Sequence, residues 1–260
     1  MTWLTAGFQV FGPDPGVLAW LEKAGAEALA CANDPDLRAA WVRHGGTWFA
    51  GVNVLDNDGE GRVAGAPSLA CAALAQASAI SGPLPLDRGQ VSIAYPGYPQ
   101  QDAGESDANH RYRKTRDAAH LDGLLPVGPD RRRMLKEPHG WILGLPVTAC
   151  SAGAAPLVVW QGSHEVMRAR LGTVLRDYPP EAWGLVDLTD SYQAARREVF
   201  ETCPRIELHA RPGQALLLHR LVLHGVAPWA EGATAPQEGR AIVYFRPQLS
   251  GGAGDWLRLP

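Results

Sequence analysis

Short apolar segments separated by turn-forming residues dominate the chain from Gln90 onward. Residues 90–95 alternate polar and apolar side chains, which is the period of a half-buried β-strand. Segments of similar character follow at 118–124, 141–148, 156–160, 205–209, 214–218 and 240–245. Because short strands with turn signals between them favour closed or double-layered sheets, we expect an antiparallel barrel or a jelly roll. The predicted fold class is mainly β with flanking helices.

The residues before this part favour helices. Asp14-Pro15 and Asp34-Pro35 each combine a capping side chain with proline at the first helical position, so we predict helices within residues 15–45. The segment 47–54 is expected to be a strand or extended arm, and an alanine-rich run predicts another helix at 67–80. We therefore expect one domain over residues 1–260, in which a helical N-terminal part (1–87) supports the jelly-roll core (88–247). A helical insert at 165–204, a candidate lid, interrupts the core, and 248–260 form a tail.

Composition excludes several classes of partner. The 260 residues carry a net charge of −3 without a basic excess, so we expect no nucleic-acid partner. No apolar run approaches the length of a membrane span, and the N-terminus lacks the pattern of a signal peptide, so we expect no membrane partner. The four cysteines are scattered and form no C-x-x-C pair, which is typical of reduced thiols in a cytoplasmic protein. Oligomeric state has no readable signal.

The first candidate for chemistry is His120-Leu121-Asp122. In an extended segment, residues i and i+2 point to the same face, so His120 and Asp122 would present an imidazole and a carboxylate side by side. These are two members of the 2-His-1-carboxylate set that holds non-haem Fe(II) and leaves coordination positions open. The pattern therefore predicts a metal site if a second histidine joins it.

Two histidines are candidates for the third ligand. His224 precedes Gly225, which permits close backbone approach, at a point where a strand would open towards a barrel mouth. His219 lies inside an apolar run and is more typical of a packed, hydrogen-bonded histidine. We therefore predict that His224 completes the site.

An arginine is expected to anchor a carboxylate in the same cavity. Arg240 begins the segment that follows His224, and successive strands of a barrel are usually neighbours. A guanidinium there would be costly unless it met a carboxylate, which its fork suits in a bidentate manner. Arg246 has the same strand parity and is the alternative, although it lies at the far end of the segment.

Taken together, these segments resemble a known enzyme family. The resemblance rests on His120-Leu-Asp122, the segments 156–164 and 212–219, His224-Gly and Arg240-Ala-Ile-Val-Tyr, and it covers residues 88–247. The chain resembles the phytanoyl-CoA dioxygenase-like branch of the Fe(II)/2-oxoglutarate-dependent oxygenases. The resemblance implies a double-stranded β-helix that holds Fe(II) through His120, Asp122 and His224, with 2-oxoglutarate paired to Arg240.

The resemblance also implies the reaction. Such an enzyme consumes O2 and 2-oxoglutarate, releases succinate and CO2, and oxidises a small-molecule substrate. Because Asp122 is a carboxylate where related halogenases have a small residue, we expect hydroxylation or desaturation. The alternative is a non-oxidative cupin-like isomerase or small-molecule binding protein, against which the aspartate argues, since cupin sites usually combine His-x-His with glutamate. The sequence does not identify the substrate or a role for the basic run Arg131–Arg133.

Overall fold

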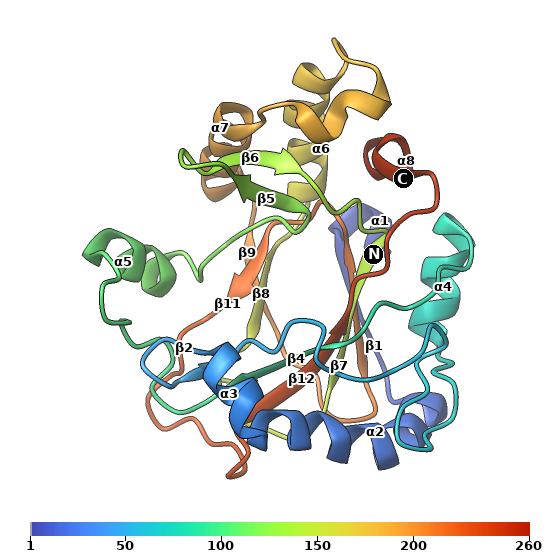
Figure 1. Ribbon diagram of the computed structural model, residues 1–260, viewed down its shortest axis with the longest axis vertical. Coiled ribbons are helices and arrows are strands. Elements are labelled where there is room, and N and C mark those ends of the chain that lie inside the picture. The colour runs from blue at the N-terminus through green and yellow to red at the C-terminus, as the bar shows by residue number, and fades with distance from the viewer. Residues whose placement is uncertain (1) are drawn as a thin grey trace.

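The computed structural model describes residues 2–260 and contains two antiparallel sheets that face each other (Figure 1). The seven-stranded sheet has the order β1 (Phe8–Phe11), β10 (Ala215–His219), β7 (Trp141–Pro146), β12 (Arg240–Phe245), β4 (Gln90–Ala94), β3 (Trp48–Phe49), β2 (Val42–Arg43). The second sheet has the order β11 (His224–Val226), β8 (Leu157–Trp160), β9 (Arg205–Leu208). The predicted jelly roll, mainly β with flanking helices, is confirmed.

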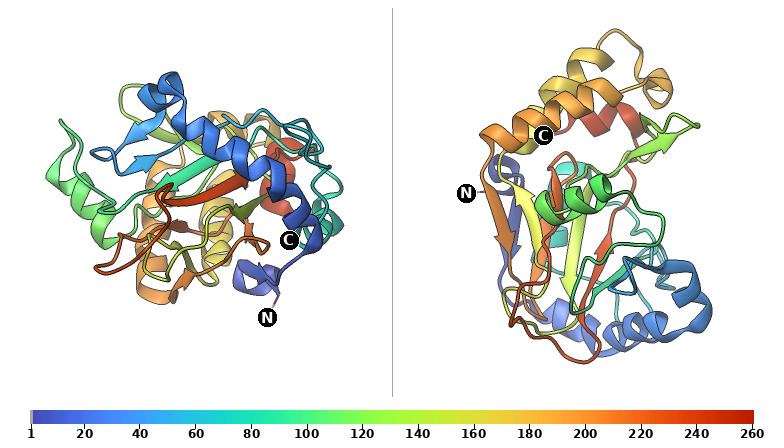
Figure 2. Two further views of the ribbon diagram at one scale, coloured as in Figure 1. Left: turned by 90° about the horizontal axis from the view of Figure 1, so that it is seen from below. Right: turned by 90° about the vertical axis from the view of Figure 1, so that its left-hand side faces the viewer.

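The helices lie around this core. They are α1 (Trp3–Ala6), α2 (Pro15–Asn33), α3 (Pro35–Trp41), α4 (Ala72–Ser81), α5 (Asp107–Thr115), α6 (Ser163–Leu175), the 3-10 helix η1 (Pro180–Leu185), α7 (Thr189–Thr202) and α8 (Gly252–Arg258). The two predicted caps form, because Asp14 accepts from the Gly16 N–H at 2.8 Å and Asp34 from the Leu37 N–H at 2.9 Å. Figure 2 shows α2 and the pair α6–α7 at opposite ends of the molecule.

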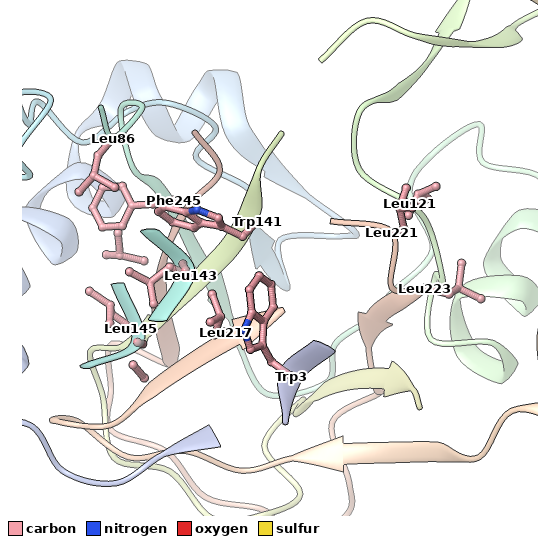
Figure 3. Close-up of a cluster of buried hydrophobic side chains, with 14 of the residues drawn as sticks. Trp3, Leu86, Leu121, Trp141, Leu143, Leu145, Leu217, Leu221, Leu223 and Phe245 are labelled. Carbon is pink, nitrogen blue, oxygen red and sulfur yellow. The ribbon is translucent and has the colours of Figure 1, made fainter. Parts of the chain in front are cut away.

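The central strands are covered on both faces, which explains their nearly continuous apolar sequences. All six residues of β7 are buried. Leu143 and Leu145 point to the helix-covered side, where they share a core with Trp20 of α2 and Phe245 of β12 (Figure 3). Ile142 belongs instead to the cluster between the two sheets. Period-two alternation therefore divides each strand between an outer core and the barrel interior.

The insert between β8 and β9 is helical, as expected. It consists of α6, η1 and α7 and packs on a hairpin formed by β5 (Leu124–Val127) and β6 (Arg132–Leu135). The Leu188 N–H donates to the Arg133 carbonyl at 2.8 Å, and the Arg133 N–H donates to Thr189 Oγ1 at 2.8 Å. Part of the basic run Arg131–Arg133 thus lies in a strand that holds the insert.

Several sequence expectations differ from the structure. Residues 1–87 are not only helical, because β1 adds to one edge of the main sheet and β2 and β3 form the other. Residues 118–124 do not form a strand, since Asp117 and Ala118 have φ of 54° and 52° and regular pairing starts at Leu124. The polar region before them contains α5, the helix expected at 67–80 begins at Ala72, and the tail contains α8. Tertiary contacts fix each of these polar or short elements, and local pattern carries little signal for them.

Within residues 2–260, no helix has the length and apolar character to cross a membrane. The four cysteines, Cys31, Cys71, Cys150 and Cys203, are all unpaired and partly buried. Burial raises the pKa of the Cys71 thiol, which favours its neutral form.

The two-sided burial of β7 generates a stability prediction. Leu143 is fully buried, whereas Leu185 of η1 is 77% exposed. Leu143→Ala should lower the free energy of unfolding by about 2–5 kcal/mol, because it leaves a cavity between the sheet and the helices. Leu185→Ala should change it by less than ~0.5 kcal/mol. Urea denaturation measures both, and equal losses would contradict the placement of the core.

Candidate metal centre

Backbone contacts bring two distant segments together at one end of the barrel. His120 and His224 exchange reciprocal hydrogen bonds, with His120 N to His224 O at 2.8 Å and His224 N to His120 O at 3.1 Å. The Val226 N–H also donates to the Asp117 carbonyl at 2.9 Å. A Cβ on Gly225 would lie 2.1 Å from that carbonyl oxygen, so only glycine allows this approach.

A buried ion pair holds the irregular segment from behind. Arg205 of β9 donates Nε to Asp117 Oδ2 at 2.7 Å and Nη2 to Asp117 Oδ1 at 2.9 Å, and the Asp117 carboxylate is almost fully buried. The next turn is fixed by the Tyr192 hydroxyl of α7, which accepts from the Leu121 N–H at 3.1 Å. These contacts set the direction in which His120 and Asp122 point.

His120, Asp122 and His224 converge, with one ligand atom of each within 4.8 Å of the others. His120 Nε2 lies 3.3 Å from Asp122 Oδ1, and His224 Nε2 lies 3.8 Å from Asp122 Oδ2. Donor atoms about 2.1 Å from one ion and at right angles to each other lie roughly 3 Å apart. The observed spacings are therefore close to those required by one face of a metal's coordination sphere.

The backbone selects the tautomer of both histidines. Nδ1 of His120 lies 3.0 Å from the Ala118 carbonyl, and Nδ1 of His224 lies 3.0 Å from the Val222 carbonyl. A carbonyl only accepts, so Nδ1 must carry the proton, and in the neutral imidazole Nε2 keeps its lone pair. This outer contact orients metal-bound histidines in proteins. Both Nε2 atoms face Asp122, as ligation requires.

The charge states of the buried pair also suit a cation. Burial by itself would raise the pKa of Asp122, but its contacts with His120, His224 and Arg246 hold it well below its usual value. Burial lowers the pKa of His224 to about 4, with a further contribution from His120. The carboxylate is thus ionised and His224 neutral near pH 7, which are the forms that bind metal.

The three side chains line a cavity of about 250 Å³ that continues into the barrel. Its walls are mostly apolar, and its polar lining comes from Gln90, Ser92, Tyr244 and Arg246. Arg246 Nη1 lies 3.5 Å from Asp122 Oδ2, so this guanidinium stands beside the metal ligands. Among the described residues, Arg246 Nε and the Tyr244 hydroxyl are buried without a hydrogen-bond partner. Both atoms are therefore donors without an acceptor among residues 2–260.

Arg240 does not line this cavity. It lies at the opposite end of the same strand face and lines a second hollow with Thr148, Arg211 and Ile242. Arg246, the alternative arginine, is the one beside the metal ligands. His219 is fully buried and hydrogen-bonded, as expected for a packed histidine, and accepts from the Leu221 N–H at 2.9 Å.

The sequence reasoning missed part of the cavity. Trp48 and Ser92 meet in its wall, where Trp48 Nε1 donates to Ser92 Oγ at 3.0 Å. Tyr244 could have been found, because it shares strand parity with Arg240 and Arg246. Trp48 lies in the expected extended segment 47–54, but a strand of two residues does not show which side chain faces the cavity. The insert was expected to be a lid, but none of the described residues that line the cavity belongs to it.

Comparisons with known proteins give structural neighbours only. No protein-family model and no curated protein matches the sequence. The structure is similar to AviO1 from Streptomyces viridochromogenes Tue57, with 19% identity, a TM-score of 0.49, and coverage of 95% of this chain and 92% of that one. It is also similar to the epimerase SnoN in complex with Fe3+, alpha ketoglutarate and nogalamycin RO, with 17% identity, a TM-score of 0.48, and coverage of 95% of this chain and 80% of that one. A third similar structure is HygX from Streptomyces hygroscopicus with nickel and 2-oxoglutarate bound. It has 18% sequence identity, a TM-score of 0.41, and coverage of 95% of this chain and 85% of that one.

The close approach at Gly225 generates a prediction about metal binding. Gly225→Ala should push β11 away from Asp117 and separate His224 from His120, which weakens Co2+ binding at this site by ~10–100-fold. Gly12→Ala is the matched control, because a Cβ at Gly12 has no neighbour within 4 Å. Titration followed by Co2+ absorption, with Asp122→Ala as the zero reference, measures the effect. Unchanged affinity in Gly225→Ala would contradict the geometry.

Proposed function

We propose that this protein is an Fe(II)- and 2-oxoglutarate-dependent oxygenase that hydroxylates or desaturates a small molecule and releases succinate and CO2. The observation that carries the proposal is the convergence of His120, Asp122 and His224 with both Nε2 atoms free to ligate. One carboxylate and two imidazoles on one side of an open cavity are typical of non-haem Fe(II) enzymes that activate O2. The cupin-like alternative does not need an arginine such as Arg246 beside the metal to bind the carboxylate of a co-substrate.

The residues present fit Fe(II). The two imidazoles and the carboxylate are borderline and hard donors respectively, which Fe(II) accepts, and no thiol is part of the set. Bound there, the ion would supply the redox chemistry and hold O2 and co-substrate in the positions that face the cavity. The protein fixes the histidine tautomers, keeps Asp122 ionised and surrounds the reaction with mostly apolar walls.

The unpartnered donors of the cavity support a carboxylate ligand. Arg246 Nε and the Tyr244 hydroxyl are buried with no acceptor among the described residues, and such groups are costly unless a ligand satisfies them. Arg246 also lies beside Asp122, at the metal end of the cavity. We assign these donors to the carboxylate of 2-oxoglutarate that lies next to the metal.

If Arg246 binds the carboxylate next to the metal, the second carboxylate of 2-oxoglutarate would point away from Asp122, along β12. Arg240 begins β12 and Arg246 directly follows it with the same parity, with Ile242 and Tyr244 between them. Tyr244 lines the metal cavity and Ile242 lines the hollow of Arg240, so the two spaces are neighbours along this strand. Arg240 forms no salt bridge within residues 2–260. We therefore keep Arg240 as the proposed partner of the distal carboxylate.

The remaining residues of the cavity form the space that a substrate would occupy. Trp48, Val52, Ile142 and Val226 present apolar surface around the metal site, which favours a substrate with an apolar part. His120 is about half exposed, so the cavity opens to solvent beside the metal ligands.

The unpaired cysteines fit a reducing compartment, and we propose the cytoplasm.

The proposal predicts a spectroscopic signature. Anaerobic addition of Fe(II) and then 2-oxoglutarate should give a visible absorption band, and exposure to O2 should convert 2-oxoglutarate to succinate. Asp122→Ala should abolish the band because it removes a ligand. Asp130→Ala, at a carboxylate that is 75% exposed, is the matched control and should keep it. Metal binding that does not respond to 2-oxoglutarate would favour the cupin-like alternative.

The two arginines predict separable effects on the co-substrate. Arg240→Gln should weaken 2-oxoglutarate binding by roughly 10–100-fold, because a charged hydrogen-bonded pair is lost. It should hardly affect 2-oxopentanoate, which lacks the distal carboxylate. Arg246→Gln should weaken both compounds, because both keep the carboxylate next to the metal. Competition with 2-oxoglutarate in the succinate assay measures this.

Reversed selectivity would reassign the anchor. If Arg246→Gln weakened only 2-oxoglutarate and Arg240→Gln changed neither compound, the distal carboxylate would lie at Arg246. Retention of the Fe(II) signal in both variants would show that the metal ligands stay in place.

A further inference from the structure

A second cluster of potential ligands lies outside the metal centre. His44, in the turn between β2 and β3, meets Asp102 and Glu105 from the loop before α5, and one ligand atom of each lies within 4.8 Å of the others. We propose that His44, Asp102 and Glu105 form a second divalent cation site, selective for Zn2+, that is separate from the His120–Asp122–His224 centre. The inference does not depend on the proposed oxygenase activity.

His44 is buried without a hydrogen-bond partner. Its side chain is only 7% exposed, and neither ring nitrogen makes a hydrogen bond among residues 2–260. Nδ1 lies 3.2 Å from Asp102 Oδ2, but the geometry is not that of a hydrogen bond. A buried imidazole usually satisfies at least one nitrogen, so these orphan atoms point to a ligand. Burial is the main cause that lowers the pKa of His44, and the charge of Arg113 lowers it further. The imidazole is therefore neutral and able to ligate.

Each carboxylate is held from behind and keeps one oxygen for the cluster. Asp102 Oδ1 accepts from the Gly45 N–H at 2.7 Å, which leaves Oδ2 facing His44. Glu105 Oε1 pairs with Arg113, while Oε2 accepts only a long 3.4 Å contact from the Asp102 N–H. Outer contacts of this kind orient ligands in metal sites.

A candidate for a fourth ligand lies next to Glu105. His110 Nδ1 lies 3.8 Å from Glu105 Oε2 and is buried without a hydrogen-bond partner. Two carboxylates and two imidazoles would complete a four-coordinate set, which is the usual geometry of structural zinc. Ca2+ prefers six to eight oxygens, which this cluster does not offer. The charge of Arg113 offsets one of the two carboxylates, so the empty cluster carries −2 + 1 = −1 with neutral imidazoles.

The cluster connects to the wall of the catalytic cavity. The His44 ring stacks on Trp48 with ring centroids 5.3 Å apart and an interplanar angle of 5°. Trp48 lines the cavity and donates to Ser92 Oγ. A cation at His44 would therefore fix the ring against which Trp48 packs and tie α5 to the edge of the main sheet.

Metal counting tests the site on the full-length chain. The protein is stripped with a chelator, dialysed against Zn2+ and analysed for zinc. Wild type should bind two ions, and Asp102→Asn should bind one. The asparagine oxygen can still accept from the Gly45 N–H, so this variant removes the ligand and preserves the turn. The double variant His120→Ala/His224→Ala should also bind one ion, and its combination with Asp102→Asn none.

Further variants make the result decisive. His44→Gln should lose the same ion as Asp102→Asn, with folding checked by circular dichroism. In a second experiment, Zn2+ should raise the melting temperature of His120→Ala/His224→Ala. It should not raise the melting temperature when Asp102→Asn is added to that double variant. His209→Ala, at an exposed histidine outside both clusters, should keep both ions. An unchanged zinc count in folded Asp102→Asn and His44→Gln would overturn the proposal. If the metal centre fails instead, both variants still lose one ion relative to wild type.

Discussion

The reciprocal hydrogen bonds between His120 and His224 are the contact on which the metal centre depends. They join a segment that is otherwise irregular to the edge of the smaller sheet, and they place two imidazoles with ring centroids 4.5 Å apart. A regular strand at 118–122 would not need Gly225 or the left-handed Asp117 and Ala118. The irregular backbone lets Asp122 turn back towards both histidines. Strained segments of this kind are common where a site must be held in one geometry.

Placing this site at the mouth of a barrel has an energetic cost that the surroundings offset. Asp122 is largely buried, and an isolated buried carboxylate would be unfavourable. Arg246 supplies a compensating charge and a long 3.5 Å hydrogen bond, and the two imidazoles lie 3.3 and 3.8 Å from the carboxylate oxygens. Arg205 compensates the buried carboxylate of Asp117 in the same way, with its charge and two hydrogen bonds. The two aspartates on either side of His120 therefore have different tasks, since one faces the cavity and the other anchors the segment to β9.

Covering both faces of the main sheet makes the functional face available. Helix α2 and its neighbours cover the outer face, where Leu143, Leu145 and Phe245 pack, so the inner face does not have to supply all of the core. The inner face can then carry polar residues such as Gln90, Ser92, Arg240 and Arg246 among its apolar ones. The insert follows the same principle, because it packs on the β5–β6 hairpin and holds Leu121 through Tyr192 without entering the cavity.

The sequence by itself determined most strand segments of the core, although not the one expected at 118–124, the helix starts at Asp14 and Asp34, and the choice of His224 over His219. These follow from period, capping and flanking glycine, which are local properties of the chain. Tertiary structure decided the rest. It added β1 and β2 to the sheet edges, because two to four residues carry too little periodicity to be recognised, and it decided that Trp48 and Phe49 of the expected extended segment 47–54 pair as β3. It also placed Arg246 beside Asp122 and Arg240 in a neighbouring hollow. Strand parity puts both arginines on one face, but only the packing of the second sheet and of the 117–122 segment decides which end of that face the metal ligands occupy.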